Sequence, residues 1–413
     1  MSRMNKNVNG SSFVFTDGEI GNVEEKKIDV SIVDNTEFRT QLIARIENIT
    51  SNIIQQICSG RLPQISYSIS HNYTSMDPET AVENDFSDCA LNFTSHSFEE
   101  TEQIDKECTQ NVIQNDKRTV IDFARRKSKD KFALIMTVMA AAHRLLITNT
   151  TITRRSLYYD LKNEKTLNLA PDQRFVDQAV NHLADLLNCA PWELNLLPTS
   201  KGLAAGELTL TLTNNRIVDC TVPGGALIPF MASNVVSVRT RAKMVLIVEK
   251  DAVFQKLLED DCPTLLNCIL VTGKGYPDVA TRMLVKLLSD KMELPVYIIV
   301  DADPFGVDIM CVYRFGSATL SKERESLACP KVRWLGIHPS ELLALGASTV
   351  SLTGFDLSKL AAIEGRPYMT HAFLKELEIM RMGKAEIESV SSFSRKFLIA
   401  TYLPCKIKGN DYI

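Results

Sequence analysis

The sequence predicts an α/β protein in which a winged-helix (CAP-like) DNA-binding unit precedes a parallel, doubly wound sheet. Three amphipathic helices and a short β-hairpin lie between residues 117 and 232, which is the element order of a winged helix. From residue 233 to 413, apolar strands alternate with helices, as in a parallel sheet that helices cover on both faces. The 413 residues suffice for both units, since domains commonly have about 100–200 residues.

The composition excludes several classes of protein. Hydrophobic residues make up 45% of the chain and charged residues 23%, as in globular proteins. No apolar run approaches the about 18 residues of a transmembrane helix, so we expect no membrane association. The ten cysteines form no CxxC pair and the six histidines form no HExxH motif. These absences argue against a secreted disulfide scaffold and against a zinc hydrolase.

An amphipathic helix is expected near the N-terminus, after a polar tail at 1–35 that we expect to be disordered. Apolar residues recur at spacings of three and four over residues 36–60. Such a helix cannot bury its apolar stripe alone, so it docks either on its own domain or on another chain. We favour docking on a partner subunit. The stripe comprises Phe38, Leu42, Ile46, Ile49, Ile53 and Ile57.

Residues 61–116 read as a flexible acidic insert. Residues 71–110 hold ten acidic residues and one basic residue, a net charge of −9. The whole chain carries −4, which leaves +5 for the remainder. A weakly basic fold is compatible with DNA binding but does not indicate it by itself.

The winged-helix unit is predicted from three helical segments, at 130–147, 151–164 and 171–189. Thr153 is placed as an N-cap of the second helix, and Pro171 lies at the first turn of the third. Alternating strands then flank Asn214 and Asn215, residues that tolerate the positive φ of a tight turn. The strands of this hairpin are 207–212 and 216–222.

The second unit is predicted from four apolar strands and the helices between them. Each strand is short and rich in Val, Ile and Leu, as a strand buried on both faces should be. The C-terminal part, 355–400, is mostly helical by pattern. The strands are 244–250, 268–275, 296–303 and 332–337, and the helices are 252–261, 277–292 and 304–316.

Carboxylates follow two of these strands. Glu249 ends the first strand, and Asp301 and Asp303 end the third, where ligands of open parallel sheets bind. Acids that converge repel one another unless a cation compensates, and oxygen ligands alone suit Mg²⁺. The alternative is that each acid merely caps a loop. The glycines of the loop at 273–278 do not form a Walker motif, so no ATPase activity is expected.

Six motifs resemble, in sequence and in order, those of the family of meiotic double-strand-break transesterases and topoisomerase VI A subunits. The resemblance covers roughly residues 117–413 and implies that the second unit is a Toprim domain. The motifs are RRSLYYD, PTSKGLAAG, LIVEKDAVFQ, VTGKGYPD, VDADPFGVDIM and RWLGIHPSE.

The resemblance implies a role for each of eight residues. Tyr159 matches the family nucleophile, and Arg155 matches the arginine one helical turn before it. A tyrosine has a pKa of about 10, so it needs help as a nucleophile. Residues four apart share a helix face, so a guanidinium there can favour the phenolate and clamp phosphate oxygens. The implied Mg²⁺ ligands are Glu249, Asp301 and Asp303, and the implied DNA contacts are Lys201, Tyr276 and Arg366.

The implied activity is a topoisomerase-like cut in duplex DNA that leaves the protein on the 5′ end and initiates meiotic recombination. The implied partners are a second copy of the chain, meiotic accessory break-formation proteins and a topoisomerase VI B-like regulatory subunit. The implied location is the nucleus, on meiotic chromosomes. Three alternatives stay open: a topoisomerase VI A subunit that reseals its cut, a catalytically silent DNA-binding scaffold, and a Toprim nuclease or primase that needs no tyrosine.

Overall fold

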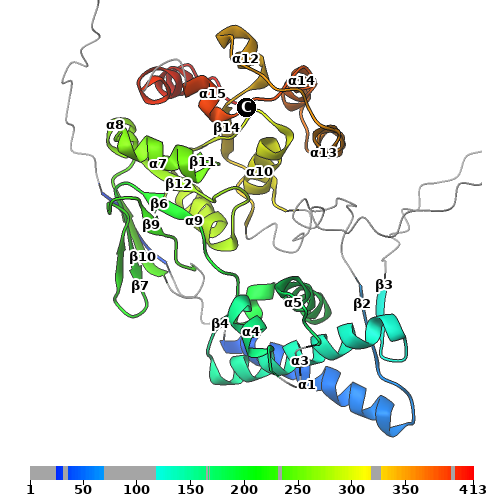
Figure 1. Ribbon diagram of the computed structural model, residues 1–413. Coiled ribbons are helices and arrows are strands. Elements are labelled where there is room, and N and C mark those ends of the chain that lie inside the picture. The colour runs from blue at the N-terminus through cyan, green and yellow to red at the C-terminus, as the bar shows by residue number, and fades with distance from the viewer. Residues whose placement is uncertain are drawn as a thin grey trace, which may run out of the picture.

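The chain folds into two lobes, each with its own hydrophobic core (Figure 1). The computed structural model describes residues 25–30, 36–68, 118–163, 166, 168–230, 235–317, 327–391 and 396–413. The predicted tail before residue 25 and the insert between 69 and 117 lie outside the described residues.

The helical lobe is built on α3, whose apolar face is covered by α1 and α5. By length and composition alone, residues 128–148 of α3 would suffice to cross a membrane. Ile135, Val138 and Ala142 of this helix are fully buried in the lobe, as in the core helix of a globular domain. The elements of the lobe are α1 (Thr36–Cys58), β2 (Gln64–Ser68), β3 (Arg118–Asp122), α3 (Arg126–Thr148), β4 (Ile152–Thr153), α4 (Arg154–Asp160), α5 (Gln173–Leu187), η1 (Pro191–Leu194) and β5 (Leu196–Leu197).

Helix α1 packs on its own lobe, which corrects the preference for docking on a partner. Leu42 and Ile46 are buried in the core of the helical lobe. Arg45 Nη1 also donates a hydrogen bond to the carbonyl of Leu187 at the end of α5, at 2.7 Å. Of the six stripe residues only Ile57 is mostly exposed, at 55%, and the others pack against this core. The core of the helical lobe therefore covers most of the predicted stripe.

Helix α4 is shorter than the predicted 151–164 because the chain enters it from a strand. Ile152 and Thr153 pair in parallel with β5, so the helix begins only at Arg154. The predicted N-cap is confirmed, since Thr153 Oγ1 accepts a hydrogen bond from the Ser156 amide at 3.0 Å. Helix α5 begins slightly later than predicted, after the N-cap Asp172.

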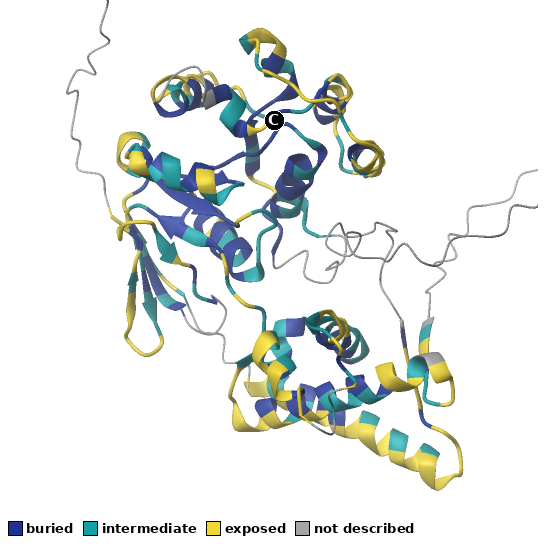
Figure 2. Ribbon diagram, viewed as in Figure 1, coloured by how far each residue is buried: buried dark blue, intermediate teal, exposed yellow. Residues whose placement is uncertain are grey.

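The sheet lobe contains the predicted parallel sheet. Its strand order is β14-β13-β11-β12-β6-β9, and the first four strands are mutually parallel. Alternate residues of β11 face opposite sides: Val245 and Ile247 face the core under α9, α10, α13 and α14, and Leu246 and Val248 face α7 and α16. Helices thus cover both faces, and the central strands β11, β12 and β13 are buried throughout (Figure 2).

The strands of the sheet lobe are β1 (Lys26–Asp29), β6 (Leu203–Ala205), β7 (Leu208–Leu212), β8 (Ile217–Asp219), β9 (Ala226–Leu227), β10 (Val235–Thr240), β11 (Met244–Val248), β12 (Cys268–Thr272), β13 (Val296–Ile299) and β14 (Val332–Gly336). Its helices are α7 (Asp251–Glu259), α8 (Cys262–Leu266), α9 (Val279–Asp290), α10 (Pro304–Phe315), α12 (Pro339–Leu345), α13 (Gly354–Glu364), α14 (His371–Met380), α15 (Ile387–Ser391), η3 (Leu398–Tyr402) and α16 (Leu403–Lys408).

The predicted β-hairpin forms, but it is not a wing on the three helices. Strands β7 and β8 join β10 and β1 in a four-stranded sheet of order β1-β10-β7-β8. Leu208 and Leu210 alternate inward and join the core that also holds Val245 of the parallel sheet. A hairpin with one apolar face is buried by whichever core that face meets, which here lies in the sheet lobe. The helical unit therefore ends near residue 200, not at 232.

Two predicted irregular segments contain strands. Residues 26–29, expected within the disordered tail, form the edge strand β1 against β10. Residues 64–68, expected within the flexible insert, form β2 and pair antiparallel with β3. Both pairings join residues more than 40 positions apart, and no local pattern in the sequence reports such a partner.

Candidate functional site

Tyr159 lies on the exposed face of α4 with Arg155 directly beside it. The tyrosine is 58% exposed, and Arg155 Nη2 lies 3.4 Å from its hydroxyl oxygen. The guanidinium carbon is 5.9 Å from the ring centroid. The four-residue spacing on a capped helix turn produces this contact, because residues i and i+4 face the same way. The phenol is thus both open to a ligand and next to a fixed positive charge.

The neighbouring Tyr158 is held inside the lobe. Its hydroxyl donates to the carbonyl of Pro171 at 3.4 Å, and the ammonium of Lys162 lies 4.7 Å from its ring centroid. Lys162 Nζ also donates to that same carbonyl at 3.0 Å. These contacts fix the C-terminal end of α4 against the start of α5. Of the two tyrosines, Tyr158 is half-buried and bonded within the lobe, whereas Tyr159 is mostly exposed.

An ion pair anchors the other end of α4. Arg154 Nη1 lies 3.6 Å from Asp177 Oδ1 on α5, and both side chains are largely shielded from solvent. Burial raises the pKa of Asp177, and the charge of Arg154 opposes that rise. With its cap, its ion pair and Tyr158, this seven-residue helix is held at both ends. Tyr159 and Arg155 therefore stand on a rigid support.

The three predicted metal ligands gather at the carboxyl ends of β11 and β13. The Asp301 amide donates to Glu249 Oε2 at 2.9 Å, and Asp301 Oδ1 accepts from the Ile387 amide at 2.9 Å. Asp303 is the N-cap of α10, where its Oδ1 accepts from the Gly306 amide at 2.6 Å. The chain leaves β13 at Ile299, whereas the predicted strand ran to 303, so a turn and a helix cap orient the two aspartates.

These carboxylates are held where negative charge is unfavourable. Burial, then the charges of Asp301 and Asp303, raise the pKa of Glu249 to about 8. Burial raises the pKa of Asp301 and of Asp303 as well, and hydrogen bonds to the backbone oppose the rise at both. A divalent cation would relieve this repulsion, and an all-oxygen donor set suits Mg²⁺. The residues present therefore fit the ion that the sequence predicts.

Lys250, which follows Glu249, supplies a positive charge at this edge. Its ammonium lies 2.9 Å from Asp301 Oδ2, 3.1 Å from Glu386 Oε2 and 3.4 Å from Glu388 Oε2. Burial alone would lower the pKa of this lysine, but the hydrogen bond and charge of Asp301 outweigh it and raise the pKa. No motif in the sequence singled out Lys250, although a Glu-Lys pair at a strand end is a visible signal.

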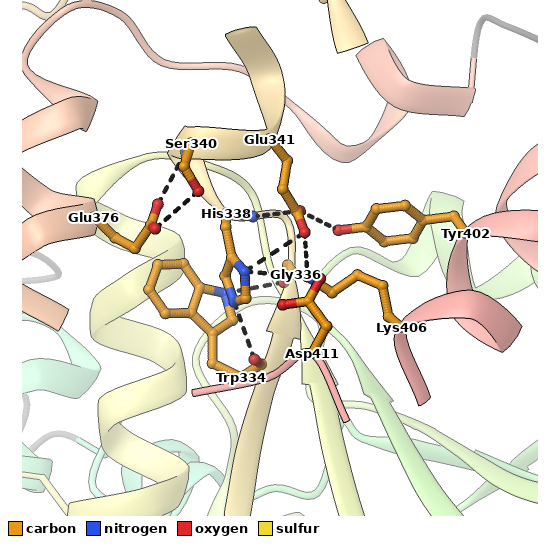
Figure 3. Close-up of polar contacts among 9 residues, drawn as sticks. All are labelled: Trp334, Gly336, His338, Ser340, Glu341, Glu376, Tyr402, Lys406 and Asp411. Atoms are coloured by element: carbon orange, nitrogen blue, oxygen red, sulfur yellow. Dashed lines mark hydrogen bonds and ion pairs between the residues drawn. The ribbon is translucent and has the colours of Figure 1, made fainter. Parts of the chain in front are cut away.

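A tighter group of ligand atoms lies elsewhere and is already filled by a lysine. Among the described residues, His338, Glu341 and Asp411 bring one ligand atom each within 4.8 Å of one another. Figure 3 shows the ammonium of Lys406 among them, bonded to Glu341, 3.1 Å from His338 Nδ1 and 3.2 Å from Asp411 Oδ2. Burial would raise the pKa of Glu341, but hydrogen bonds from the His338 amide, Lys406 and Tyr402 lower it.

This network fastens the C-terminal segment to the end of β14. His338 Nε2 lies 3.1 Å from the carbonyl of Trp334, to which it donates, and this leaves Nδ1 to accept from Lys406 (Figure 3). A cation that is already part of the chain makes a metal ion unnecessary there. The network is therefore structural, and the carboxylates at β11 and β13 remain the candidate metal centre.

The three predicted DNA contacts have different surroundings. Lys201 is exposed just before the start of β6. Tyr276 and Arg366 instead converge on Asp308 of α10, with the tyrosine hydroxyl donating at 2.6 Å and Arg366 Nη2 at 2.5 Å. Lys359 reaches the same carboxylate at 2.6 Å, and all three charged side chains are largely buried. The buried Asp308, which the sequence analysis missed, makes Arg366 part of an internal ion-pair cluster.

Two family models match the chain. One is described as the Toprim domain of Spo11 and of the topoisomerase 6 A subunit, and it matches residues 244–407. The other is described as type IIB DNA topoisomerase and matches residues 130–196. The first lies within the sheet lobe and the second within the helical lobe, in agreement with the boundary near residue 200.

Several curated proteins are similar along most of their length. The human meiotic recombination protein SPO11 is 37% identical over 385 residues, which cover 91% of this chain and 89% of that protein. The Drosophila melanogaster meiotic recombination protein W68 is 37% identical, over 73% of this chain and 90% of that protein. The Arabidopsis thaliana DNA topoisomerase 6 A subunit is 33% identical, over 73% of this chain and 71% of that protein.

Proposed function

Because the chain belongs to the family of Spo11 and the topoisomerase 6 A subunit, which makes topoisomerase-like breaks in DNA, we propose that Tyr159 is its nucleophile. The observation that carries the proposal is the exposed Tyr159 hydroxyl, 3.4 Å from Arg155 Nη2 on a helix anchored at both ends. The substrate is duplex DNA, and the break initiates meiotic recombination.

The reaction exchanges one phosphodiester for another. The phenolic oxygen of Tyr159 attacks the phosphorus, a bond from tyrosine to phosphorus forms, and the bond to the 3′ oxygen breaks. The phenol loses its proton and the leaving 3′ oxygen gains one, so a free 3′ hydroxyl and a 5′ phosphotyrosyl link result. No water enters, and the energy of the bond is retained in the covalent complex.

Arg155 assists by engaging the phosphate. Its guanidinium lies beside the Tyr159 hydroxyl, where the attacked phosphate must lie. Its planar guanidinium then offers two parallel donors to the phosphate oxygens as their charge grows. Arg154 cannot take this role, since Asp177 engages it.

Glu249, Asp301 and Asp303 would hold Mg²⁺. When bound, the ion stabilises negative charge on the reacting phosphate and its leaving oxygen. The protein's own contribution is to hold three oxygen donors at one edge, through the Asp301 amide, the Ile387 amide and the cap of α10. Lys250 balances part of their charge until the ion arrives.

The tyrosine and the carboxylates stand on different lobes, which favours a site shared between two copies of the chain. Tyr159 lies on α4 in the helical lobe, and Glu249 follows β11 in the sheet lobe (Figure 1). A homodimer would then hold two composite sites, one for each DNA strand. Meiotic accessory proteins and a topoisomerase VI B-like subunit would complete the assembly on chromosomes in the nucleus.

Mixing two inactive variants tests the shared site. In a dimer of one Tyr159→Phe chain and one Glu249→Gln chain, a shared arrangement leaves one site intact, because the intact tyrosine meets the intact glutamate. The mixture should then nick one strand, although each variant alone is inactive. If each chain used its own carboxylates, the mixed dimer would cut nothing.

The similarity to the Arabidopsis topoisomerase protein supports a second candidate function, cutting followed by resealing. Relaxation of supercoiled DNA in the presence of ATP and a B-type subunit distinguishes the two. Relaxed closed circles would identify a resealing enzyme, whereas persistent covalent breaks would identify a break-forming one.

A further inference from the structure

The loop that carries Lys201 is held by a single carboxylate. Asp278 Oδ2 accepts hydrogen bonds from the Lys201 amide at 2.6 Å and from the Gly202 amide at 3.0 Å. Its other oxygen, Oδ1, accepts from the Thr281 amide at 2.8 Å and from Thr281 Oγ1 at 3.0 Å. One side chain therefore caps α9 and fixes a loop 77 residues earlier in the chain.

The loop lies too close to α9 for any side chain at position 202. A Cβ there would stand 1.9 Å from Thr281 Oγ1 and 3.1 Å from the carbonyl of Thr272. The Gly202 carbonyl in turn accepts from the Ile228 amide at 3.0 Å. The glycine thus allows the contact that Asp278 secures, and the backbone of Lys201 is fixed although its side chain is exposed.

The position of Lys201 is suited to a polyanion. The chain leaves the helical lobe at β5 and enters the sheet lobe at β6, and Lys201 lies between these strands. Its Nζ lies 3.5 Å from the carbonyl of Lys274, whose own ammonium lies 3.2 Å from Asp251. Lys201 thus reaches the loop after β12 where the lobes join, and the charge of the neighbouring Lys274 is engaged by Asp251.

An aspartate beside a lysine that binds DNA is unexpected, because its negative charge repels DNA phosphates. Asn, Ser or Thr would cap α9 equally well. None of them offers two acceptor oxygens, one for each pair of donors. The second oxygen therefore explains why this cap is an aspartate.

We propose that Asp278 is a positioning residue for DNA binding, which holds Lys201 in the orientation that contacts phosphate. The proposal rests on the proposed function and on the phosphate contact by Lys201 that the family resemblance implies, and it deepens that function. Positioning and simple electrostatics predict opposite results when the charge of Asp278 is removed. Loss of a negative charge alone would tighten DNA binding, whereas loss of the loop's acceptor should weaken it.

The test compares full-length variants binding a short DNA duplex, by fluorescence anisotropy at several salt concentrations. Asp278→Asn keeps the size of the side chain but replaces one of its two acceptor oxygens with an NH₂ group. That group cannot accept the two hydrogen bonds that the oxygen accepted. We expect binding to weaken roughly tenfold, the order expected when about 1.4 kcal/mol of binding energy is lost. Glu259→Gln on α7 is the control for the loss of one negative charge, since Glu259 is exposed and lies outside the Asp278 network, and it should not weaken DNA binding.

A double-mutant cycle with Lys201→Ala completes the test. If Asp278 acts through Lys201, then Asp278→Asn has no further effect in the Lys201→Ala background. Equal weakening in both backgrounds, or tighter binding by Asp278→Asn, would overturn the proposal. No effect of Lys201→Ala would also overturn it, while the tyrosine chemistry, measured as covalent complex, would stand. Melting temperatures of each variant separate loss of binding from loss of fold.

Discussion

The ammonium of Lys250 lies 2.9 Å from Asp301 Oδ2, on a carboxylate that the candidate metal centre also uses. Glu386 and Glu388 lie within 3.4 Å of the same ammonium, so Lys250 has acceptors to which it can turn when a cation binds Asp301. The positively charged ammonium of Lys250 thus lies beside the site predicted for Mg²⁺.

Lys250→Met should therefore bind divalent cations more tightly. Removing a unit positive charge at about 4 Å is worth about 1 kcal/mol in water and about 4 kcal/mol near a protein surface, so we expect at least about a fivefold rise in affinity. Isothermal titration with Mn²⁺ measures it, and Lys256→Met on α7 is the control for loss of one positive charge. Weaker binding by Lys250→Met would mean that the lysine organises the site instead of competing for it.

The raised pKa of Glu249 predicts a pH dependence of stability. Between its usual pKa near 4.5 and about 8, the folded, metal-free protein binds a proton that the unfolded chain does not. Stability should therefore fall as pH rises through this window. Melting curves in chelator at pH values from about 5.5 to about 8.5 should show the decline, and Glu249→Gln should flatten it. An identical slope in the variant would show that other groups cause the decline.

Helix α1 should respond to substitution differently along its length. Leu42 is fully buried, so Leu42→Ala should cost about 2–5 kcal/mol of stability in the chain alone. Ile54 is more than half exposed, so Ile54→Ala should change stability by less than about 0.5 kcal/mol. Chemical denaturation of the isolated chain measures both. Equal, small effects would mean that α1 does not pack on its lobe in solution.

Arg155→Lys should cut DNA poorly while binding it normally. A lysine keeps the charge but cannot present two parallel donors, so covalent-complex formation should slow by about 10²-fold, as for loss of one transition-state donor. DNA affinity should stay within about twofold of the wild type. Near-normal cleavage by the lysine variant would show that charge alone suffices.

Much of the sheet lobe was predictable because its signals are local. The strands β11, β12, β13 and β14 are continuous apolar runs, and each loop between them precedes a helix with a clear cap or stop. The positions of Glu249, Asp301 and Asp303 followed from the strand ends. The antiparallel additions β1, β6, β9 and β10 were not predicted, since their pairing depends on distant segments.

The place of the hairpin and the half-buried surroundings of Tyr276 and Arg366 have one physical cause. The alternation of Leu208 and Leu210 in β7 is the same whether the strand packs on helices or on a sheet. The sequence pattern therefore does not determine which core buries these two side chains. Likewise, whether Arg366 meets solvent or Asp308 is decided by tertiary packing. The burial of a charged side chain can be predicted only when its oppositely charged partner, distant in the sequence, is known.

The measurement that tests the proposed chemistry most directly is the identity of the residue joined to DNA. Wild-type protein, with its B-type partner and Mg²⁺, should form a covalent complex that survives denaturation. In this complex the protein is joined to the 5′ end of the cut strand. After nuclease digestion, mass spectrometry should find the nucleotide on Tyr159. Tyr159→Phe should form none and bind DNA as before, whereas Tyr158→Phe should still form it. A nucleotide on Tyr158, or covalent complex in the Tyr159→Phe variant, would contradict the assignment of Tyr159 as the nucleophile.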